Sequence, residues 1–226
     1  MKLIVFDLDQ TIMDIFKFHN KTTEITFKKV FGVKAKMDEV DYVGKTLKRV
    51  LTELAVLKGI KKNERQKKIP KAIKLYEKTL ISILPENTNS YLLPGASSLI
   101  KKLSKDKNKF LIVLTGDSKK IAKTALKRAC LLKNFQFLIT GEHTKSRTKM
   151  MKKALKKAHR QTKQKKFEKV IIIGDSTHDI EAGKAVGALT IAVLTGNDSK
   201  YKLKKEGANY IFKNLKDKKI LKIIEK

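Results

Sequence analysis

The sequence contains a single cysteine among its 226 residues, so no disulfide can form within the chain. A lone cysteine fits the reducing conditions of the cytoplasm, which is therefore the expected location. Cys130 stands among apolar residues of a segment with a helical pattern, and we expect it to pack in the interior. No Gly/Ser-rich or Pro-rich linker divides the chain, and neither an internal repeat nor a low-complexity tract is present apart from scattered lysine.

Long hydrophobic runs are missing as well. The first run, Leu3-Ile4-Val5-Phe6, is too short for a signal peptide or a membrane span. It fits a buried strand better, and we expect no association with a membrane. The length suffices for a core domain with a smaller insertion.

Acidic residues are scarce: 22 Asp and Glu stand against 53 Lys and Arg, which gives a formal net charge of +31. Such a surface attracts small phosphate esters and polyanions alike. Arginine is rare among these cations and occurs only at positions 49, 65, 128, 147 and 160. Because arginine dominates specific recognition of phosphates and bases, we interpret the excess as lysines on solvated faces. Nucleic-acid binding is therefore expected to be at most weak and non-specific.

From about residue 14 to residue 88 the apolar residues follow a helical period. Two stripes have the spacing of a helix face, one over residues 47–57 and one over residues 73–84. Gly59 and Pro85 follow these stripes as natural stop signals. No strand pattern interrupts the stretch, so residues 14–88 are predicted to form an all-helical insertion.

After Pro94-Gly95 the pattern alternates between strands and helices. Strand-like runs occupy residues 110–114, 135–139, 170–173 and 190–193, and helical segments lie at about 118–132, 146–164 and 179–186. Continuous apolar strands that alternate with helices predict a parallel sheet covered on both faces. With the run that ends at Asp7, this predicts a doubly wound, Rossmann-like α/β core formed by residues 1–13 and 89–226.

Polar residues follow the ends of several predicted strands. In a doubly wound sheet, ligands bind beyond the carboxyl ends of the strands. The first strand ends at Asp7 and Asp9, another at Thr115, and a later one at Asp175, with Asp179 four residues on. Any one of these aspartates could simply cap a helix. Crowded carboxylates repel one another, however, and hard oxygen ligands suit Mg²⁺, so the set predicts a magnesium site.

These segments resemble the motifs of the haloacid dehalogenase-like hydrolases. Residues 7–11, Asp-Leu-Asp-Gln-Thr, are similar to the first motif, which is normally Asp-x-Asp-Gly-Thr. Residues 114–116 resemble the second motif and residues 174–179 the fourth. Gln10 stands where glycine is usual, and Gly116 stands where the second motif often has asparagine.

The third motif of the family is a lysine that is usually followed by proline. Lys145 fits its spacing to Asp175, although Ser146 replaces the proline. Lys149 is an alternative for this motif.

The resemblance extends over nearly the whole chain. Residues 42–44, together with the following apolar stripe, resemble the helical cap of the phosphoglycolate-phosphatase-like branch. Residues 93–96 resemble the point where that branch re-enters its core, and residues 203–210 resemble its closing segment. The insertion at 14–88 is then a cap domain that supplies substrate contacts.

The resemblance implies a mechanism with an aspartyl-phosphate intermediate. Asp7 would be the nucleophile. Asp9 would protonate the leaving group and then activate water. Asp7, the Asp9 carbonyl and Asp175 would hold Mg²⁺, and Asp179 would support the metal or its waters.

Two further residues would complete the catalytic set. Thr115 and Lys145 would bind the phosphoryl oxygens, and Gly116 would offer its backbone N–H. His19 is a candidate substrate contact, although a position on the surface is the simpler interpretation. Phe16 and Phe18 are expected to belong to the core.

The carboxylate of Asp9 favours phosphate-ester chemistry, because a dehalogenation has no leaving group that needs a proton. The expected substrate is a small phosphorylated metabolite. A sugar phosphomutase of the same superfamily is one alternative, and a polyanion-binding protein on the same scaffold is another.

Overall fold

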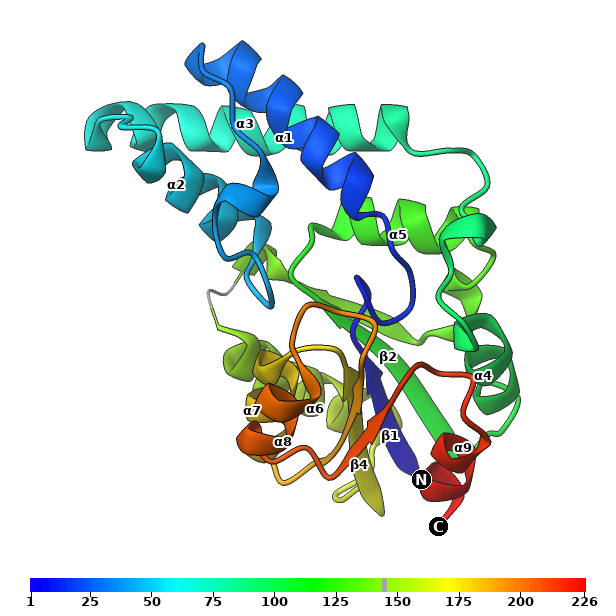
Figure 1. Ribbon diagram of the computed structural model, residues 1–226. Helices are drawn as coiled ribbons and strands as arrows, with labels where there is room; N and C mark the ends of the chain where they lie inside the picture. The colour runs from blue at the N-terminus through cyan, green and yellow to red at the C-terminus, as the bar shows by residue number, and fades with distance from the viewer. Residues whose placement is uncertain (144–145) are drawn as a thin grey trace.

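The computed structural model describes residues 1–143 and 146–226, and its centre is a six-stranded parallel sheet (Figure 1). The strand order is β3-β2-β1-β4-β5-β6. The strands are β1 (Lys2–Phe6), β2 (Lys109–Thr115), β3 (Phe137–Thr140), β4 (Lys169–Gly174), β5 (Leu189–Val193) and β6 (Tyr210–Phe212). All five residues of β1 are buried, Lys2 as well as the apolar run Leu3–Phe6, and Ile4 is paired to Leu111 on one side and to Ile171 on the other.

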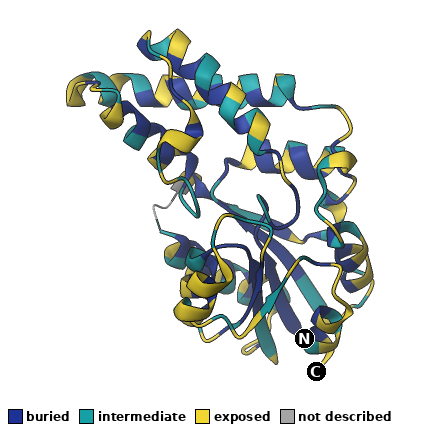
Figure 2. Ribbon diagram, in the orientation of Figure 1, coloured by how far each residue is buried: buried dark blue, intermediate teal, exposed yellow. Residues whose placement is uncertain are grey.

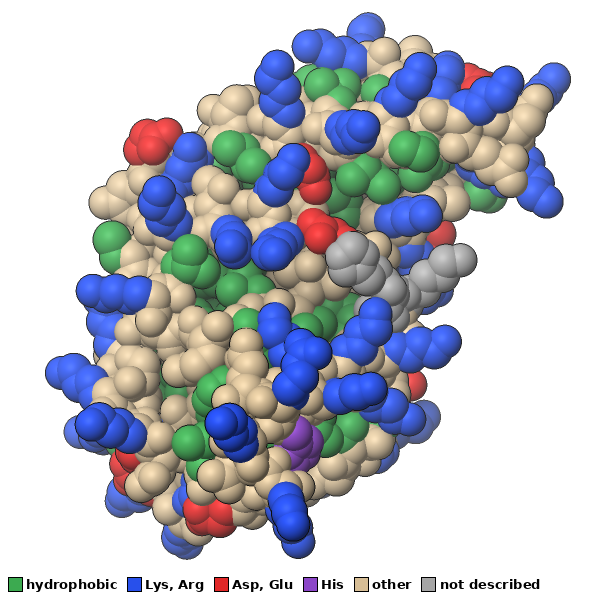
Figure 3. Space-filling model, turned by 180° about the vertical axis from the view of Figure 1, so that it is seen from behind, with side chains coloured by type: hydrophobic (Ala, Val, Ile, Leu, Met, Phe, Trp, Pro, Cys, Tyr) green, Lys and Arg blue, Asp and Glu red, His purple; other side chains and the backbone are tan. Residues whose placement is uncertain are grey.

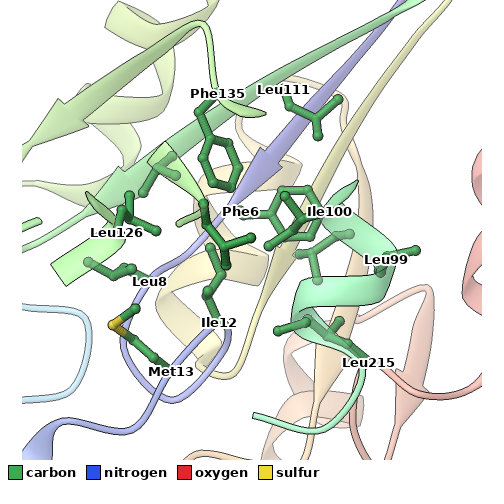
Figure 4. Close-up of a cluster of buried hydrophobic side chains, with 14 of the residues drawn as sticks. Phe6, Leu8, Ile12, Met13, Leu99, Ile100, Leu111, Leu126, Phe135 and Leu215 are labelled. Atoms are coloured by element: carbon green, nitrogen blue, oxygen red, sulfur yellow. The ribbon is translucent and has the colours of Figure 1, made fainter. Parts of the chain in front are cut away.

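Helices cover both faces of the sheet. Side chains alternate between the faces of a strand, so Ile4 and Phe6 face one layer while Leu3 and Val5 face the other. The first layer contains α4 (Ala96–Leu103), α5 (Lys119–Arg128) and α9 (Lys218–Glu225), and the second contains α6 (Arg147–Thr162) and α7 (Thr177–Lys184). Figure 4 shows Phe6 inside the first layer, beside Ile100 of α4 and Phe135. The ring of Phe6 meets that of Phe135 edge-on at 6.0 Å.

The three long helices α1 (Phe16–Phe31), α2 (Leu47–Leu57) and α3 (Lys62–Ile83) lie above the carboxyl ends of the strands (Figure 1). They enclose a separate apolar cluster around Phe27, Leu54 and Tyr76. In Figure 2 the buried residues of these helices face one another, and the outer faces are exposed. A short helix, α8 (Lys200–Glu206), packs beside α7, and 3₁₀ turns occupy Met37–Glu39, Asn89–Tyr91, Leu132–Asn134 and Gly141–His143.

The fold class expected from the sequence is confirmed, with differences in detail. The third strand begins at Phe137 rather than at residue 135, and α3 runs back to Lys62, through Pro70. The closing segment adds α8, β6 and α9, which the apolar pattern did not predict. Strand β6 has three residues, none of them buried, so it lacks the continuous apolar run that marks the other strands.

The prediction for Cys130 was wrong, because this residue is exposed. Helix α5 ends at Arg128, and Cys130 follows in a left-handed conformation with φ of 53°. The apolar stripe of the helix is already complete at Leu126, which is fully buried. The turn therefore directs Cys130 outward.

Lysine and arginine are scattered over the face seen in Figure 3, on the cap helices as well as on the core. They do not gather into one stripe on this face. Among the described residues, no helix combines the length and the apolar character that a membrane span requires.

Candidate active site

The predicted site residues gather around a cavity of about 90 Å³ between the sheet and the cap helices. The strand order reverses between β1 and β4, which is where doubly wound sheets bind ligands. The cavity lining includes Asp7, Asp9, His19, Thr115, Gly116 and Asp175. Asp179 lies behind this lining and is fully buried. The structure thus brings together every predicted site residue that it describes, whereas Lys145 lies outside the described residues.

Among the described residues, Arg147 supplies the positive charge that contacts Asp7. Its Nη2 donates to Asp7 Oδ1 and to Asp179 Oδ1, the latter at 2.6 Å, and its Nε donates to Asp179 Oδ1 at 2.9 Å. The side chain of Arg147 is 5% exposed, so these ion pairs are shielded from water. Burial alone would lower the pKa of Arg147, but Asp179 and Asp7 raise it further above its already high value. Arg147 is therefore a fixed positive charge beside the predicted nucleophile.

Arg147 was not among the residues predicted for the site, although one signal was present. It is one of five arginines in a chain dominated by lysine, and it begins the helix that follows β3. Ser146 caps this helix, with its hydroxyl accepting from the Lys149 backbone N–H at 3.4 Å. The side chain of Lys149 is exposed and does not line the cavity.

The carboxylates at the centre of the site need positive charge. Burial is the main cause that raises the pKa of Asp7 to about 7. Arg147 acts to lower this pKa, whereas Asp179 and Asp9 act to raise it. Burial, then Asp7 and Asp179, raise the pKa of Asp175 well above its usual value. One oxygen from each of Asp7, Asp175 and Asp179 lies within 4.8 Å of the others. This set of hard oxygens fits Mg²⁺.

Asp179 differs from Asp7 and Asp175 because both of its carboxylate oxygens accept hydrogen bonds from protein groups. Its Oδ2 accepts from the Ser176 hydroxyl at 2.6 Å and from the Ser176 backbone N–H at 3.2 Å, and Arg147 occupies its Oδ1. Thr11 donates to Oδ1 of Asp175 at 2.9 Å. Asp7 and Asp175 are thus the carboxylates best placed to hold a metal, and Asp179 orients Arg147.

A second group of polar side chains lies beside Asp9. His19 is buried, which contradicts the expectation of a surface histidine, because α1 packs this side chain against α3. Its Nδ1 lies 2.7 Å from the Tyr76 hydroxyl, and its Nε2 lies 3.7 Å from Asp9 Oδ1 and 3.6 Å from Asp117 Oδ2. Asp117 also lies in the site and was not among the predicted site residues. Its position in the sequence could have indicated this, because it follows Thr115 by two residues at the carboxyl end of β2.

The Asp9–His19–Asp117 cluster attracts positive charge. Burial would lower the pKa of His19, but Asp117 and Asp9 outweigh it and raise this pKa to about 9. Burial, followed by Asp9, raises the pKa of the Asp117 carboxyl to about 8. Both shifts mean that the folded protein holds protons here that its unfolded chain would release.

The cap closes directly onto the second motif. The Leu47 N–H at the start of α2 donates to the Gly116 carbonyl at 3.1 Å, and a Cβ on Gly116 would meet the Lys45 carbonyl oxygen at 2.1 Å. Glycine at this position therefore permits the close approach. Gln10, where the family usually has glycine, adopts φ of 59°, which explains that preference.

The cap side of the cavity is largely apolar. Phe16 is half-buried and stacks on Tyr42 with ring centroids 4.7 Å apart, and both line the cavity. Phe18 packs edge-on against Tyr91, at the margin of the main core. Lys45 also lines the cavity, with its amine 2.9 Å from Glu53 and 3.2 Å from Asp41.

The raised pKa values predict how stability depends on pH. Asp7, His19 and Asp117 bind protons more tightly in the folded state, so folding takes up protons between about pH 4 and pH 9. The contribution of His19 is complete below pH 6.5 and is lost as the pH rises through about 9. We expect the melting temperature of the metal-free protein to fall from pH 6 to pH 9 in a calorimetric series.

The His19→Gln variant is the control for that series, because glutamine does not titrate. It should flatten the decline above pH 6.5. A melting temperature that rises over the same range in the wild type would contradict the assignment.

Comparison with known proteins agrees with this geometry. The chain aligns with haloacid dehalogenase-like hydrolases over residues 4–193. No curated protein sequence matches it. Several solved structures share its fold at 18–23% sequence identity, each matched over nearly its full length.

A structure from Clostridium acetobutylicum, described as a predicted phosphatase, has a TM-score of 0.74 and 23% identity, with 100% of this chain and 99% of that chain covered. One from Haemophilus somnus 129pt, described as a predicted phosphoglycolate phosphatase, has a TM-score of 0.75 and 20% identity, with 99% and 97% covered. A β-phosphoglucomutase from Clostridium difficile has a TM-score of 0.74 and 18% identity, with 98% and 96% covered. With the family match extending over most of its length, the chain belongs to the haloacid dehalogenase-like hydrolases.

Proposed function

We propose that the protein is a Mg²⁺-dependent phosphatase that hydrolyses a small phosphate monoester, in the manner of phosphoglycolate phosphatases. The observation that carries the proposal is the placement of Asp7. This carboxylate directly follows β1, lines the cavity and contacts a buried guanidinium, with Asp9 two residues further along the same loop. A nucleophile and a second carboxylate in one small cavity suit phosphoryl transfer in two steps.

In the first step an oxygen of Asp7 attacks phosphorus, the ester bond breaks, and the phosphoryl group is carried on the carboxylate. The guanidinium of Arg147 donates to Oδ1 of Asp7 and offsets the negative charge that the substrate brings. Thr115 is positioned at the end of β2, where its Oγ1 accepts from the Asp117 N–H at 3.1 Å. Its hydroxyl hydrogen is left to bind a phosphoryl oxygen.

Asp9 would act as general acid and then as general base. It protonates the oxygen of the leaving alcohol and later takes a proton from the water that attacks the phospho-enzyme. Its side chain is about one-third exposed to the cavity, in contrast to the buried Asp7. This difference suits a residue that exchanges protons with alcohol and water.

Asp7 and Asp175 would hold the Mg²⁺, together with the Asp9 carbonyl, and the metal when bound supplies charge neutralisation between carboxylates and phosphate. Asp179 would support the site indirectly, because it accepts hydrogen bonds from Arg147 and from Ser176 and so holds both side chains in place. Lys145, the third-motif prediction, remains a proposed phosphate contact. Arg147 is the described cation that reaches the nucleophile, and we assign the charge contact on that side to it.

The direct test is phosphate release from a panel of phosphorylated metabolites. EDTA should abolish turnover, Mg²⁺ should restore it, and Ca²⁺ should be a poor replacement, because Ca²⁺ prefers longer bonds and more ligands. The small, largely apolar cavity favours compact substrates over nucleotides and oligonucleotides. An unchanged rate in EDTA would refute the metal assignment.

A sugar phosphomutase is the second candidate, since solved structures of similar fold include β-phosphoglucomutases. A mutase returns the phosphoryl group to a sugar and releases little free phosphate. Product analysis with a hexose 1-phosphate distinguishes the two: isomerised sugar phosphate indicates a mutase, whereas free sugar and phosphate indicate a phosphatase.

A further inference from the structure

The Asp9–His19–Asp117 cluster contains three polar atoms without a hydrogen bond. Asp9 Oδ1, His19 Nε2 and Asp117 Oδ2 are shielded from solvent and find no hydrogen-bond partner among the described residues. His19 and Asp117 are 5% and 7% exposed, so water does not readily satisfy them. Unpaired buried polar atoms are costly, and three that converge on one point call for a common partner.

The distances within the cluster are those of ligands around a shared cation. His19 Nε2 lies 3.7 Å from Asp9 Oδ1 and 3.6 Å from Asp117 Oδ2, beyond the range of about 2.7–3.2 Å for a hydrogen bond. Ligand atoms about 2.0–2.1 Å from one zinc ion lie about 3.3–3.6 Å apart when the bond angles are about 109–120°. A small adjustment of the side chains would place all three at bonding distance.

Tyr76 orients the imidazole as metal sites require. A histidine that binds a metal through one nitrogen usually donates its other N–H to a fixed acceptor. Here the Tyr76 hydroxyl lies 2.7 Å from Nδ1, and its own hydrogen is left for the His19 carbonyl, 3.4 Å away. At neutral pH Nε2 also carries a proton, because the pKa of His19 is raised to about 9, so zinc binding would release this proton. With the remaining proton on Nδ1, the lone pair of Nε2 would then point into the cluster.

We propose that Asp9, His19 and Asp117 form a binding site for a zinc ion, separate from the Mg²⁺ site at Asp7 and Asp175. One nitrogen and two carboxylate oxygens suit Zn²⁺, whereas Mg²⁺ prefers oxygen alone. The three ligands leave a fourth position open toward the cavity, which all three residues line.

Zinc at this position would act on both the chemistry and the cap. A carboxylate of Asp9 bound to zinc is withdrawn from proton transfer, so Zn²⁺ inhibits the phosphatase. The site also joins two parts of the molecule, because His19 and Tyr76 come from the cap helices α1 and α3 while Asp9 and Asp117 come from loops of the core. Bound zinc therefore fastens the cap to the core.

The test measures metal binding independently of activity. Zn²⁺ is titrated into metal-free protein with excess Mg²⁺ present to occupy the other site, and Co²⁺ replaces Zn²⁺ for visible absorption spectroscopy. All proteins carry Cys130→Ser, because the exposed thiol would bind zinc by itself. We expect one Zn²⁺ per chain and a Co²⁺ spectrum of low coordination number.

His19→Gln and Asp117→Asn should each weaken zinc binding by about 100-fold or more, since each removes a ligand. His159→Gln is the matched control, because this half-buried histidine lies near the end of α6, outside the cavity lining, and should leave zinc binding unchanged. Circular dichroism and thermal melting show whether each variant is folded. Asp117→Asn keeps the side-chain volume if His19→Gln does not fold.

Two results would overturn the proposal. One is no zinc uptake beyond the Mg²⁺ site, which would mean that protons or a cationic side chain neutralise the cluster. The other is zinc binding that is equally strong in the folded His19→Gln and Asp117→Asn variants. Neither result depends on whether the protein is a phosphatase, because zinc binding is read directly.

Discussion

Asp7→Asn should reduce phosphate release by on the order of 10⁴-fold or more, as loss of a covalent nucleophile does in other enzymes. The amide cannot attack phosphorus, so no phospho-enzyme forms. Brief reaction with a labelled ester, followed by acid quenching, should trap labelled protein in the wild type and none in the variant. Steady-state release of phosphate measures the loss of turnover.

The same variant should remain folded, and this separates chemistry from stability. Asp7 is crowded by Asp9 and Asp179, and burial raises the pKa of its carboxyl to about 7. An uncharged asparagine removes part of that repulsion, so the metal-free variant should melt no lower than the wild type at pH 8. Asp106→Asn, in the turn before β2, is the control and should keep full activity. Substantial turnover by folded Asp7→Asn would refute the proposed nucleophile.

Arg147→Met should reduce turnover by about 10²–10³-fold, the usual effect of losing one charge contact in a transition state. Removal of the guanidinium leaves Asp7 and Asp179 buried without their cation. The variant should therefore also melt at a lower temperature, and Mg²⁺ should recover part of that stability. Kinetics and thermal melting with and without Mg²⁺ test both effects.

Arg147→Lys separates charge from geometry. Lysine keeps the charge but loses the fork that spans two carboxylates, so its activity should lie between the wild type and Arg147→Met. Lys149→Met is the matched control, two residues along the same helix with an exposed side chain, and should be nearly neutral. If Lys149→Met were as damaging as Arg147→Met, the alternative third-motif lysine would be favoured. Full activity of Arg147→Met would exclude a role for this arginine.

The sequence by itself determined the architecture and half of the site. Apolar runs such as Leu3–Phe6 are typical of buried strands, and their alternation with amphipathic helices predicts a parallel sheet with two covered faces. Since parallel strands end at one edge, Asp7, Thr115 and Asp175 had to lie together. Strand β6 was not predicted, because its three residues are too few to form an apolar run. Cys130 was predicted on the wrong side, because the turn after α5, and not the apolar face of the helix, directs its side chain.

Only the tertiary structure decided which charges meet. Arg147 is 140 residues from Asp7, and among so many cations no spacing rule selects it. The pairing follows from α6, which packs Met150 and Met151 against the sheet. Its first residue, Arg147, thereby reaches Asp7 after β1 and Asp179 in α7. His19 and Asp117 likewise lie together because the cap helices pack on the core, where the Gly116 carbonyl accepts a hydrogen bond from the Leu47 N–H at the start of α2. Periodicity fixes which face of an element is buried, whereas contacts between distant side chains depend on how the packed elements are placed in space.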